Sequence, residues 1–392
     1  MALDMTERRP GVAIFWLAAA AFALGTAEFA AMGLLPYYAA GLEVSETEAG
    51  HAVSAYALGV VIGAPLLALF GAKFSRKSFI LALIAVFVVG NILTTLAPTM
   101  NMLIAARFLT GLPHAGVLGI STLYAAEMMG KGKRAQAVSQ VLLGLTTANI
   151  IGVPAASALG QVFGWRFCFL SVAIMGAVSL YMIWKTGPND TRHPEASPLR
   201  ELEALKNRSV WLPLAMGAIG FGGMFATYSY LSATLLQHAA APEWSVAIVL
   251  AMFGIGSTVG NLVSGRISSG RLIASAGGFQ LFMVIACALY TQLIGSWQAL
   301  ALAIFLIGFS GGMVVPLQTR LMDVAGDAQT MAAAMNHAAF NLANALGPFL
   351  AGAALAAGWG WGAPGWVGVA LGVAGLGVWL LMALDDRRLA RT

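Results

Sequence analysis

Two stretches of the chain, far apart in the sequence, share one pattern and decide the fold. Residues 135–165 are AQAVSQVLLGLTTANIIGVPAASALGQVFGW, and residues 331–361 are MAAAMNHAAFNLANALGPFLAGAALAAGWGW. Asn149 in the first matches Asn344 in the second, 195 positions later. Both stretches are apolar, rich in glycine and alanine, and long enough to cross a bilayer as helices. The match indicates an internal duplication.

Other residues repeat at nearly the same distance. The pairs are Gly152 with Gly347 and Arg76 with Arg271, at 195 positions, and Glu127 with Asp323, at 196. We therefore predict an N-terminal six-helix bundle over residues 1–188, a cytoplasmic linker over 189–210 and a C-terminal six-helix bundle over 211–392. Duplicated bundles are typical of transporters, whose binding site lies between the halves.

The composition indicates a membrane protein. Hydrophobic residues make up 59% of the 392 residues and charged residues 9%, whereas soluble domains carry about 25% charged residues. Uniformly apolar runs of this length span a bilayer as helices rather than as barrel strands. The predicted spans are 12–35, 50–71, 78–97, 101–125, 136–160, 166–185, 211–235, 245–265, 272–294, 298–321, 330–356 and 361–383.

The net charge of +5 follows from topology. Basic residues fall in alternate loops and at both ends of the chain, whereas the intervening loops are acidic, with Arg166 the one basic exception. This positive-inside pattern predicts a multi-pass protein of a bacterial-type cytoplasmic (inner) membrane with both termini in the cytoplasm. It also removes any reason to expect a nucleic-acid partner.

Neither a metal nor a disulfide is expected, because Cys168 and Cys287 lie in separate spans and the five histidines are scattered. Gly254, Gly256 and Gly260 superficially match a dinucleotide-binding loop, but they lie within a membrane span with no strand before them. We expect these glycines to serve helix packing. No cofactor is expected.

Four motifs, in order, carry a family resemblance. They are LGTAEFAAMGLLP at 24–36, YALGVVIGAPLLAL at 56–69, RFLTGLPHAGVLGIS at 107–121 and FNLANALGPFLAG at 340–352. The chain resembles the major facilitator superfamily, specifically its twelve-span drug/proton antiporters and their arabinose-efflux-permease or sugar-efflux-like branch. The resemblance implies an all-α membrane protein of two pseudo-symmetric six-helix bundles that transports a small molecule and is not an enzyme.

The loop between the second and third spans departs from the family pattern. The family has a motif similar to G-x-L-A-D-R-x-G-R-R, whereas this chain has Gly71-Ala-Lys-Phe-Ser75-Arg76-Lys77, with serine in place of the acid. A reduced cytoplasmic latch, in which Arg76 pairs with Glu127, is the expectation.

Glycine and proline in the fifth span, at Gly144, Gly152, Pro154 and Gly160, resemble the antiporter signature and favour export. Ordinary packing and kinking would explain them equally. The predicted gating residues are Arg76, Lys77, Glu127, Gly152, Pro154, Arg271, Asp323, Gly347 and Pro348.

Glu28 is the only ionisable residue between Val12 and Leu35. A charge at mid-span costs about 2.5–3.5 kcal/mol on insertion scales, so such residues are usually functional. Burial disfavours the charged form of a carboxyl group, so Glu28 can exchange a proton in the physiological range. We predict that it is the main proton carrier and that protonation competes with substrate. A structural carboxyl bonded to a neighbouring helix is the alternative.

Arg107 and His114 lie seven residues apart in the fourth span. On one continuous helix they would share a face, about 10.5 Å apart along the axis, and we expect them to face a central cavity. The pKa of an unperturbed histidine is about 6.5, so His114 would titrate or form a hydrogen bond, while Arg107 would adjust the other groups. A structural clamp and a packing histidine are the alternatives.

Aromatic and methionine side chains of the seventh span predict an adaptable apolar wall, suited to lipophilic molecules and, with Glu28, to lipophilic cations. His337, Asn341 and Asn344 form a polar helical stripe that faces either the cavity or a neighbouring helix. The predicted substrate-binding residues are Phe29, Met32, Asn149, Phe221, Met224, Phe225, Tyr228, His337, Asn341 and Asn344.

The sequence thus predicts a proton-coupled secondary transporter that exports drugs or other small amphipathic molecules by alternating access. Its partners are the substrate, protons and the lipid bilayer, and a duplicated chain needs no second copy, so a monomer is expected. A proton-coupled sugar exporter of the arabinose type is the alternative within the class. An intramembrane enzyme would need a nucleophile–base constellation or metal ligands, and a channel or receptor is not favoured by a duplicated fold with single buried carboxyl and histidine groups.

Overall fold

The structure is a computed structural model that describes residues 10–71, 74–130, 133–190, 208–268, 271–325 and 329–389. Most of the predicted linker, residues 191–207, therefore lies outside the described residues. Twelve helical runs in the described chain are long and apolar enough to cross a membrane, and each overlaps one predicted span.

The described residues of the first half form ten helical elements. Its fourth span is α5 and α6, and its fifth is α7, η1 and α8, in which η1 is a π-helical turn. The elements are α1 Pro10–Gly33, α2 Leu35–Gly41, α3 Glu46–Gly71, α4 Arg76–Leu96, α5 Met100–Gly111, α6 His114–Met129, α7 Arg134–Thr147, η1 Ala148–Gly152, α8 Val153–Phe163 and α9 Trp165–Thr186.

The second half repeats this plan with a seventh span that is broken into five pieces. The elements are α11 Arg208–Ala215, η3 Met216–Gly220, α12 Gly222–Ser229, α13 Leu231–Ala233, η4 Thr234–His238, α14 Glu243–Ile267, α15 Leu272–Leu293, α16 Trp297–Ser310, η5 Gly311–Met313, α17 Val314–Ala325, α18 Gln329–Ala356 and α19 Ala363–Leu389.

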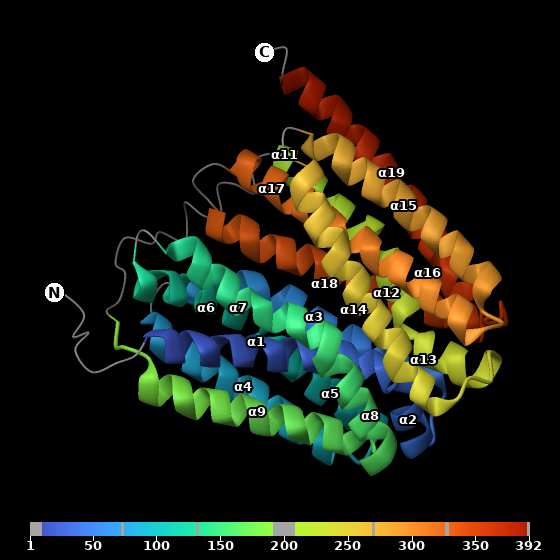
Figure 1. Cartoon of the computed structure of the whole chain (residues 1–392), viewed down its shortest axis with the longest axis horizontal. Helices are drawn as coiled ribbons and strands as arrows, with labels where there is room; N and C mark the ends of the chain where they lie inside the picture. Colours follow the sequence, from blue (N-terminus) through green and yellow to red (C-terminus); the bar gives the residue numbers. More distant parts are fainter. Residues whose placement is uncertain are drawn as a thin grey trace.

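The two halves pack along two pairs of spans. Helix α18 of the second half lies against α3 of the first, and α14 of the second half lies against η1 and α8 of the first. In Figure 1 the halves meet near α2, α8 and α13, and their other ends spread apart. We call the end that carries α2, α8 and α13 the distal end, and the end that carries Pro10 and Leu389 the terminal end.

Glycines allow these helices to approach closely. A β-carbon at Gly254 of α14 would clash with the backbone carbonyl of Asn149, and one at Gly256 or Gly260 would clash with backbone carbonyls of α16. The three glycines therefore serve helix packing, as the sequence predicts. The fifth span loses regularity at η1, immediately before Pro154, whereas α18 continues through Gly347 and Pro348 as one helix.

Side-chain hydrogen bonds between the halves are unevenly distributed along the described helices. They lie at Glu28 and toward the distal end, and they are Asn344 to Glu28, Ser54 to the Ala345 carbonyl, Thr47 to the Gly352 carbonyl, Gln161 to the Glu243 carbonyl and Gln237 to Glu46. The described polar contacts near the terminal end each stay within one half.

Candidate functional site

Glu28 lies on α1 with its side chain only 7% exposed. Its Oε1 accepts a hydrogen bond of 3.0 Å from Nδ2 of Asn344, which lies on α18 in the other half. Glu28 and Asn344 are separated by hundreds of residues in the sequence. They meet only because α18 packs against helices of the first half. The buried carboxyl group therefore joins the two halves directly.

His114 faces the other oxygen of the same carboxyl group. Its Nε2 lies 3.7 Å from Oε2 of Glu28, and its Nδ1 lies 2.7 Å from the hydroxyl oxygen of Tyr56 on α3. His114 is 3% exposed. Three helices of the first half therefore deliver Tyr56, His114 and Glu28 in sequence, and Asn344 completes the row from the second half.

Arg107 is held by aromatic faces. Its guanidinium carbon lies 4.3 Å from the centre of the Tyr56 ring and 5.3 Å from that of Phe169, and the side chain is 1% exposed. Within the described chain its three guanidinium nitrogens have no hydrogen-bond partner. Stacking of a guanidinium on rings is a recurrent cation–π geometry, and here it fixes the charge beside Tyr56.

The expectation that Arg107 and His114 share one continuous helix is wrong. Helix α5 ends at Gly111 and α6 begins at His114, because Pro113 has no N–H to donate and its ring cannot fit a regular helix interior. The two side chains converge nevertheless, since both contact Tyr56. The two side chains therefore lie on the same side, as the spacing of seven residues predicts, although the helix is interrupted at Pro113.

Aromatic residues from both halves form a cluster that begins at Phe29, the residue after Glu28 on α1. The ring of Phe29, on α1, lies 5.8 Å from that of Tyr228, 6.2 Å from that of Phe225 and 6.1 Å from that of Phe253. The ring centres of Tyr228 and Phe253 are 4.2 Å apart, and the ring of Phe221 contacts those of Phe225 and Phe340. We call Phe29, Phe221, Phe225, Tyr228, Phe253 and Phe340 the aromatic cluster. Met32 and Met224 are buried in the same hydrophobic core.

The remaining predicted binding residues are dispersed. Nδ2 of Asn341 donates to the His337 carbonyl of its own helix at 3.1 Å, so of the predicted stripe only Asn344 reaches Glu28. His337 and Asn149 are half-buried. The side-chain oxygen of Asn149 has no hydrogen-bond partner among the described residues.

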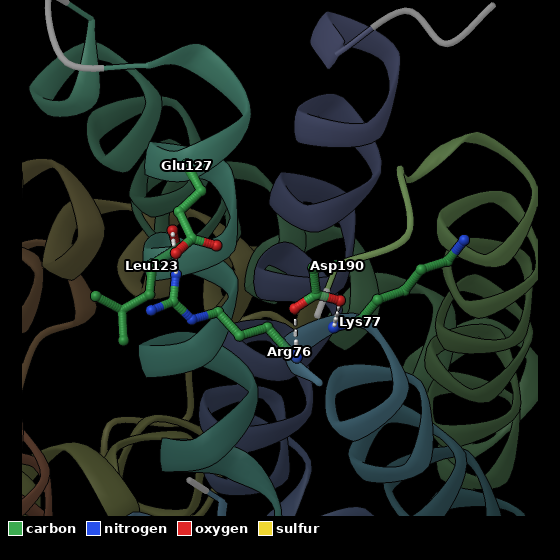
Figure 2. A network of polar contacts seen from close by, with 5 residues as sticks. All are labelled: Arg76, Lys77, Leu123, Glu127 and Asp190. Atoms are coloured by element: carbon green, nitrogen blue, oxygen red, sulfur yellow. Dashed lines mark hydrogen bonds and ion pairs between the residues drawn. The ribbon is translucent and has the colours of Figure 1, made fainter. Parts of the chain in front are cut away.

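Arg76 and Glu127, which the sequence predicts to pair, contact each other at the terminal end (Figure 2). The guanidinium of Arg76 forms an ion pair with Glu127 and lies 3.5 Å from the Leu123 carbonyl. Asp190, in the segment after α9, accepts hydrogen bonds from the backbone N–H groups of Arg76 at 2.7 Å and Lys77 at 3.2 Å. A carboxylate at the first turn of a helix is favourable because it faces unpaired N–H groups and the positive end of the dipole.

Lys77 and Tyr124 fasten the same segment. Nζ of Lys77 donates to the Gly187 carbonyl at 2.6 Å and to Oδ1 of Asn189 at 3.1 Å, and the Tyr124 hydroxyl donates to the Pro188 carbonyl at 2.5 Å. The end of the first half is therefore tied to the start of α4. Ser75 also caps α4, because its side chain accepts a hydrogen bond from the backbone N–H of Ser78.

The described residues of the second half show no ion pair equivalent to that between Arg76 and Glu127. Arg271 and Asp323 are both exposed, and no ion pair joins them in the part of the chain that the structure describes. Arg320 pairs with Asp386 at 2.8 Å instead. Of the other predicted gating residues, Gly152 packs against Thr26, Gly347 against the Gly222 carbonyl, and the carbonyl of Pro348 accepts from Tyr230 at 3.3 Å. Pro154 lies in the first turn of α8.

Sequence reasoning missed Phe169 and Tyr124, and it missed four further residues of these clusters: Tyr56, Asp190, Phe253 and Phe340. Tyr56 had a usable signal, because it is a polar residue that opens an otherwise apolar motif. Asp190 lies in a segment predicted to be a linker, and Phe253 and Phe340 are single aromatics among many. Only packing shows that these four join the site and the latch.

Comparison with known proteins agrees with this architecture. The family model described as Major Facilitator Superfamily matches residues 17–336. The chain belongs to this superfamily. The inner membrane transport protein YdhP of Escherichia coli (strain K12) is 37% identical over 346 residues, which cover 88% of this chain and 89% of that protein. It follows that this is a twelve-span membrane protein that transports small molecules, and not an enzyme.

Other relatives carry more specific names. The chloramphenicol resistance protein of Streptomyces lividans is 33% identical over 350 residues, 87% of this chain and 88% of that protein. The probable sugar efflux transporter of Helicobacter pylori is 29% identical over 377 residues, 94% of each chain. The crystal structure of the nucleoside transporter NupG matches with a TM-score of 0.73 and 14% identity, over 96% of this chain and 98% of that one, which supports the fold alone.

Proposed function

We propose that this protein is a proton-coupled exporter of drugs or other small amphipathic molecules, in which protonation of Glu28 competes with substrate. The observation that carries the proposal is the hydrogen bond between Glu28 and Asn344. It places a buried carboxyl group on the boundary between the two halves that alternating access must move. A proton that neutralises Glu28 weakens this charge-assisted bond.

The surroundings of Glu28 support an amphipathic substrate. The aromatic cluster begins at Phe29, the next residue along α1, and offers apolar faces from both halves. A lipophilic cation can rest on these faces and neutralise the carboxylate, which a proton would otherwise do. Substrate and proton would then exclude each other, as antiport requires.

The uneven hydrogen bonding between the halves supports a state closed at the distal end and open at the terminal end. The proposed membrane is the inner membrane, with the termini in the cytoplasm as the basic loops predict. The terminal end would then face the cytoplasm, and a substrate would enter from there. Arg76, Glu127 and the glycines of the fifth and eleventh spans are the proposed gating groups, and a monomer would suffice.

A sugar exporter is the second candidate. One relative is named as a probable sugar efflux transporter, and Asn344, Asn341 and His337 could provide hydrogen bonds to hydroxyl groups. The aromatic cluster would then act as a stacking platform. The closely packed apolar rings favour the first candidate.

Inverted membrane vesicles with an acidified interior would test the proposal. Tetraphenylphosphonium and arabinose would be added separately while a pH-sensitive dye is followed. We expect the cation to alkalinise the interior in the wild type and not in Glu28→Gln. Glu43→Gln, which removes an exposed carboxylate from a distal loop, should behave as the wild type. A full response from Glu28→Gln would refute the role of Glu28, and a response to arabinose alone would favour sugar export.

A further inference from the structure

Tyr56 occupies a position to which the proposed function assigns no role. It lies on α3, is 1% exposed, and stands between His114 and Arg107. Its hydroxyl oxygen is 2.7 Å from Nδ1 of His114, and its ring carries the guanidinium of Arg107 at 4.3 Å. The tyrosine and histidine rings meet edge to face, with their planes at 84°.

The protons at this contact can be counted. A tyrosine hydroxyl has one proton to donate, and a neutral imidazole has one donating and one accepting nitrogen. The hydrogen bond to His114 is the one described for this hydroxyl. If Nδ1 did not accept this hydrogen bond, the buried O–H would be left without an acceptor, which is strongly unfavourable. The hydroxyl therefore donates, Nδ1 accepts, and the proton of neutral His114 lies on Nε2.

The other side of the imidazole favours the same arrangement. Nε2 lies 3.7 Å from Oε2 of Glu28, a distance beyond a hydrogen bond but close enough for electrostatics in a buried site. An N–H at Nε2 presents positive charge to the carboxylate, whereas the opposite tautomer would present a lone pair. Glu28 and Tyr56 thus select the same tautomer from opposite sides of the ring.

Arg107 keeps Tyr56 in place for this task. A permanent positive charge against the ring face fixes the side chain and makes the hydroxyl a better donor. The other ionisable groups near this cluster are Tyr38 of α2, whose hydroxyl donates to the Ala49 carbonyl at 3.3 Å, the buried Cys168 of α9 and His337 of α18. None of the three offers His114 a hydrogen bond among those described.

We propose that Tyr56 is a positioning residue that holds His114 in the tautomer with its proton on Nε2, directed at Glu28. The consequence for transport rests on the proposed role of Glu28. In that role, His114 presents a fixed N–H to the carboxylate when Glu28 is ionised. When Glu28 is protonated, the electrostatic attraction between this N–H and the carboxyl group is lost. By orienting His114, Tyr56 thereby makes the site respond to whether the carboxyl group of Glu28 carries a proton.

The tautomer can be measured directly in the full-length protein. Protein with ¹⁵N-labelled histidine, in lipid bilayers, would be studied by solid-state NMR, in which protonated and bare ring nitrogens resonate far apart. The His114 signals are those that disappear in His114→Gln. We expect a bare Nδ1 and a protonated Nε2 in the wild type. A bare Nε2 would overturn the proposal.

Tyr56→Phe removes the hydroxyl and keeps the ring beneath Arg107. We expect the ratio of the two His114 tautomers to fall by about tenfold, the effect of losing one hydrogen bond. Tyr290→Phe is the matched control, since it deletes a buried hydroxyl that donates to Thr234 at 3.1 Å in the other half. It should leave the His114 signals unchanged. An unchanged ratio in Tyr56→Phe would overturn the proposal, and a thermal unfolding curve would confirm that this variant is folded.

Transport then separates this inference from the function it rests on. In the vesicle assay, we expect Tyr56→Phe to slow proton-driven movement of tetraphenylphosphonium, while movement down its own gradient, with no proton gradient, stays at the wild-type rate. If Glu28→Gln transports normally but the tautomer shifts as expected, the proposed function fails and the positioning role stands. If Glu28→Gln is inactive and the tautomer does not move, only the positioning role fails.

Discussion

The two halves share one frame but differ in where they place charge. Where the structure describes burial, every buried side chain with a formal charge lies in the first half: Glu28, Lys77 and Arg107. The offset of 196 that relates Glu127 to Asp323 places Ala303 opposite Arg107 and Ser310 opposite His114. The second half thus offers neutral side chains and most of the aromatic cluster.

The same contrast holds at the terminal end. In the first half, Arg76 pairs with Glu127 and Asp190 caps the neighbouring helix start. In the second half, the matching Arg271 and Asp323 are exposed and are not paired with each other. Helix packing, which depends on small residues and apolar faces, is thus alike in the two halves, whereas the described buried charges lie in the first half alone.

The largest expected difference is between the equivalent residues Asn344 and Asn149. Asn344→Ala removes the donor from Glu28, and a buried charged group that loses its partner is penalised strongly. We expect the initial rate of proton-coupled transport to fall about tenfold or more. Asn149→Ala, whose side-chain oxygen has no described partner, should change the rate less than about twofold.

Vesicle transport of tetraphenylphosphonium would measure both variants at equal protein levels. Equal losses in the two variants would contradict the assignment of the coupling contact to Asn344 alone.

A smaller difference is expected between Arg76 and Arg271. Arg76→Gln breaks the ion pair with Glu127. Both side chains of this pair are about a quarter exposed. Since solvent screens such a pair, we expect a loss of about 1 kcal/mol or less in the free energy of unfolding. Arg271→Gln should leave stability unchanged. Thermal unfolding of the purified variants would measure this, and added salt should reduce the difference.

The smallest expected effect concerns Asp190. Asp190→Asn keeps one oxygen acceptor for the N–H groups of Arg76 and Lys77 but loses the charge that favours a helix start. We expect a loss of about 0.5 kcal/mol in stability. Asp323→Asn makes the same chemical change at an exposed carboxylate and is the control. A loss of equal size in both variants would show that the cap contributes nothing specific.

Much of the site could be predicted because charged and polar side chains are costly inside a bilayer. Glu28 stands out in an apolar run, since an ionisable residue at that depth is usually functional. Arg107, His114 and Asn344 are conspicuous for the same reason. Tyr56 and Asp190 carry weaker signals, because Tyr56 is a single polar residue at the start of an apolar motif and an aspartate is common in a linker. Their roles depend on partners 58 and 114 residues away.

The sequence by itself determined the twelve spans, the two halves and the candidate carboxyl group. These follow from hydrophobic length, from the internal offset and from the cost of charge in lipid, which the linear sequence shows without any contact between helices. Only the tertiary structure decided that Asn344 reaches Glu28 across the boundary and that Tyr56 lies between His114 and Arg107. A hydrogen bond needs atoms within about 3 Å, and between distant helices only packing sets that distance.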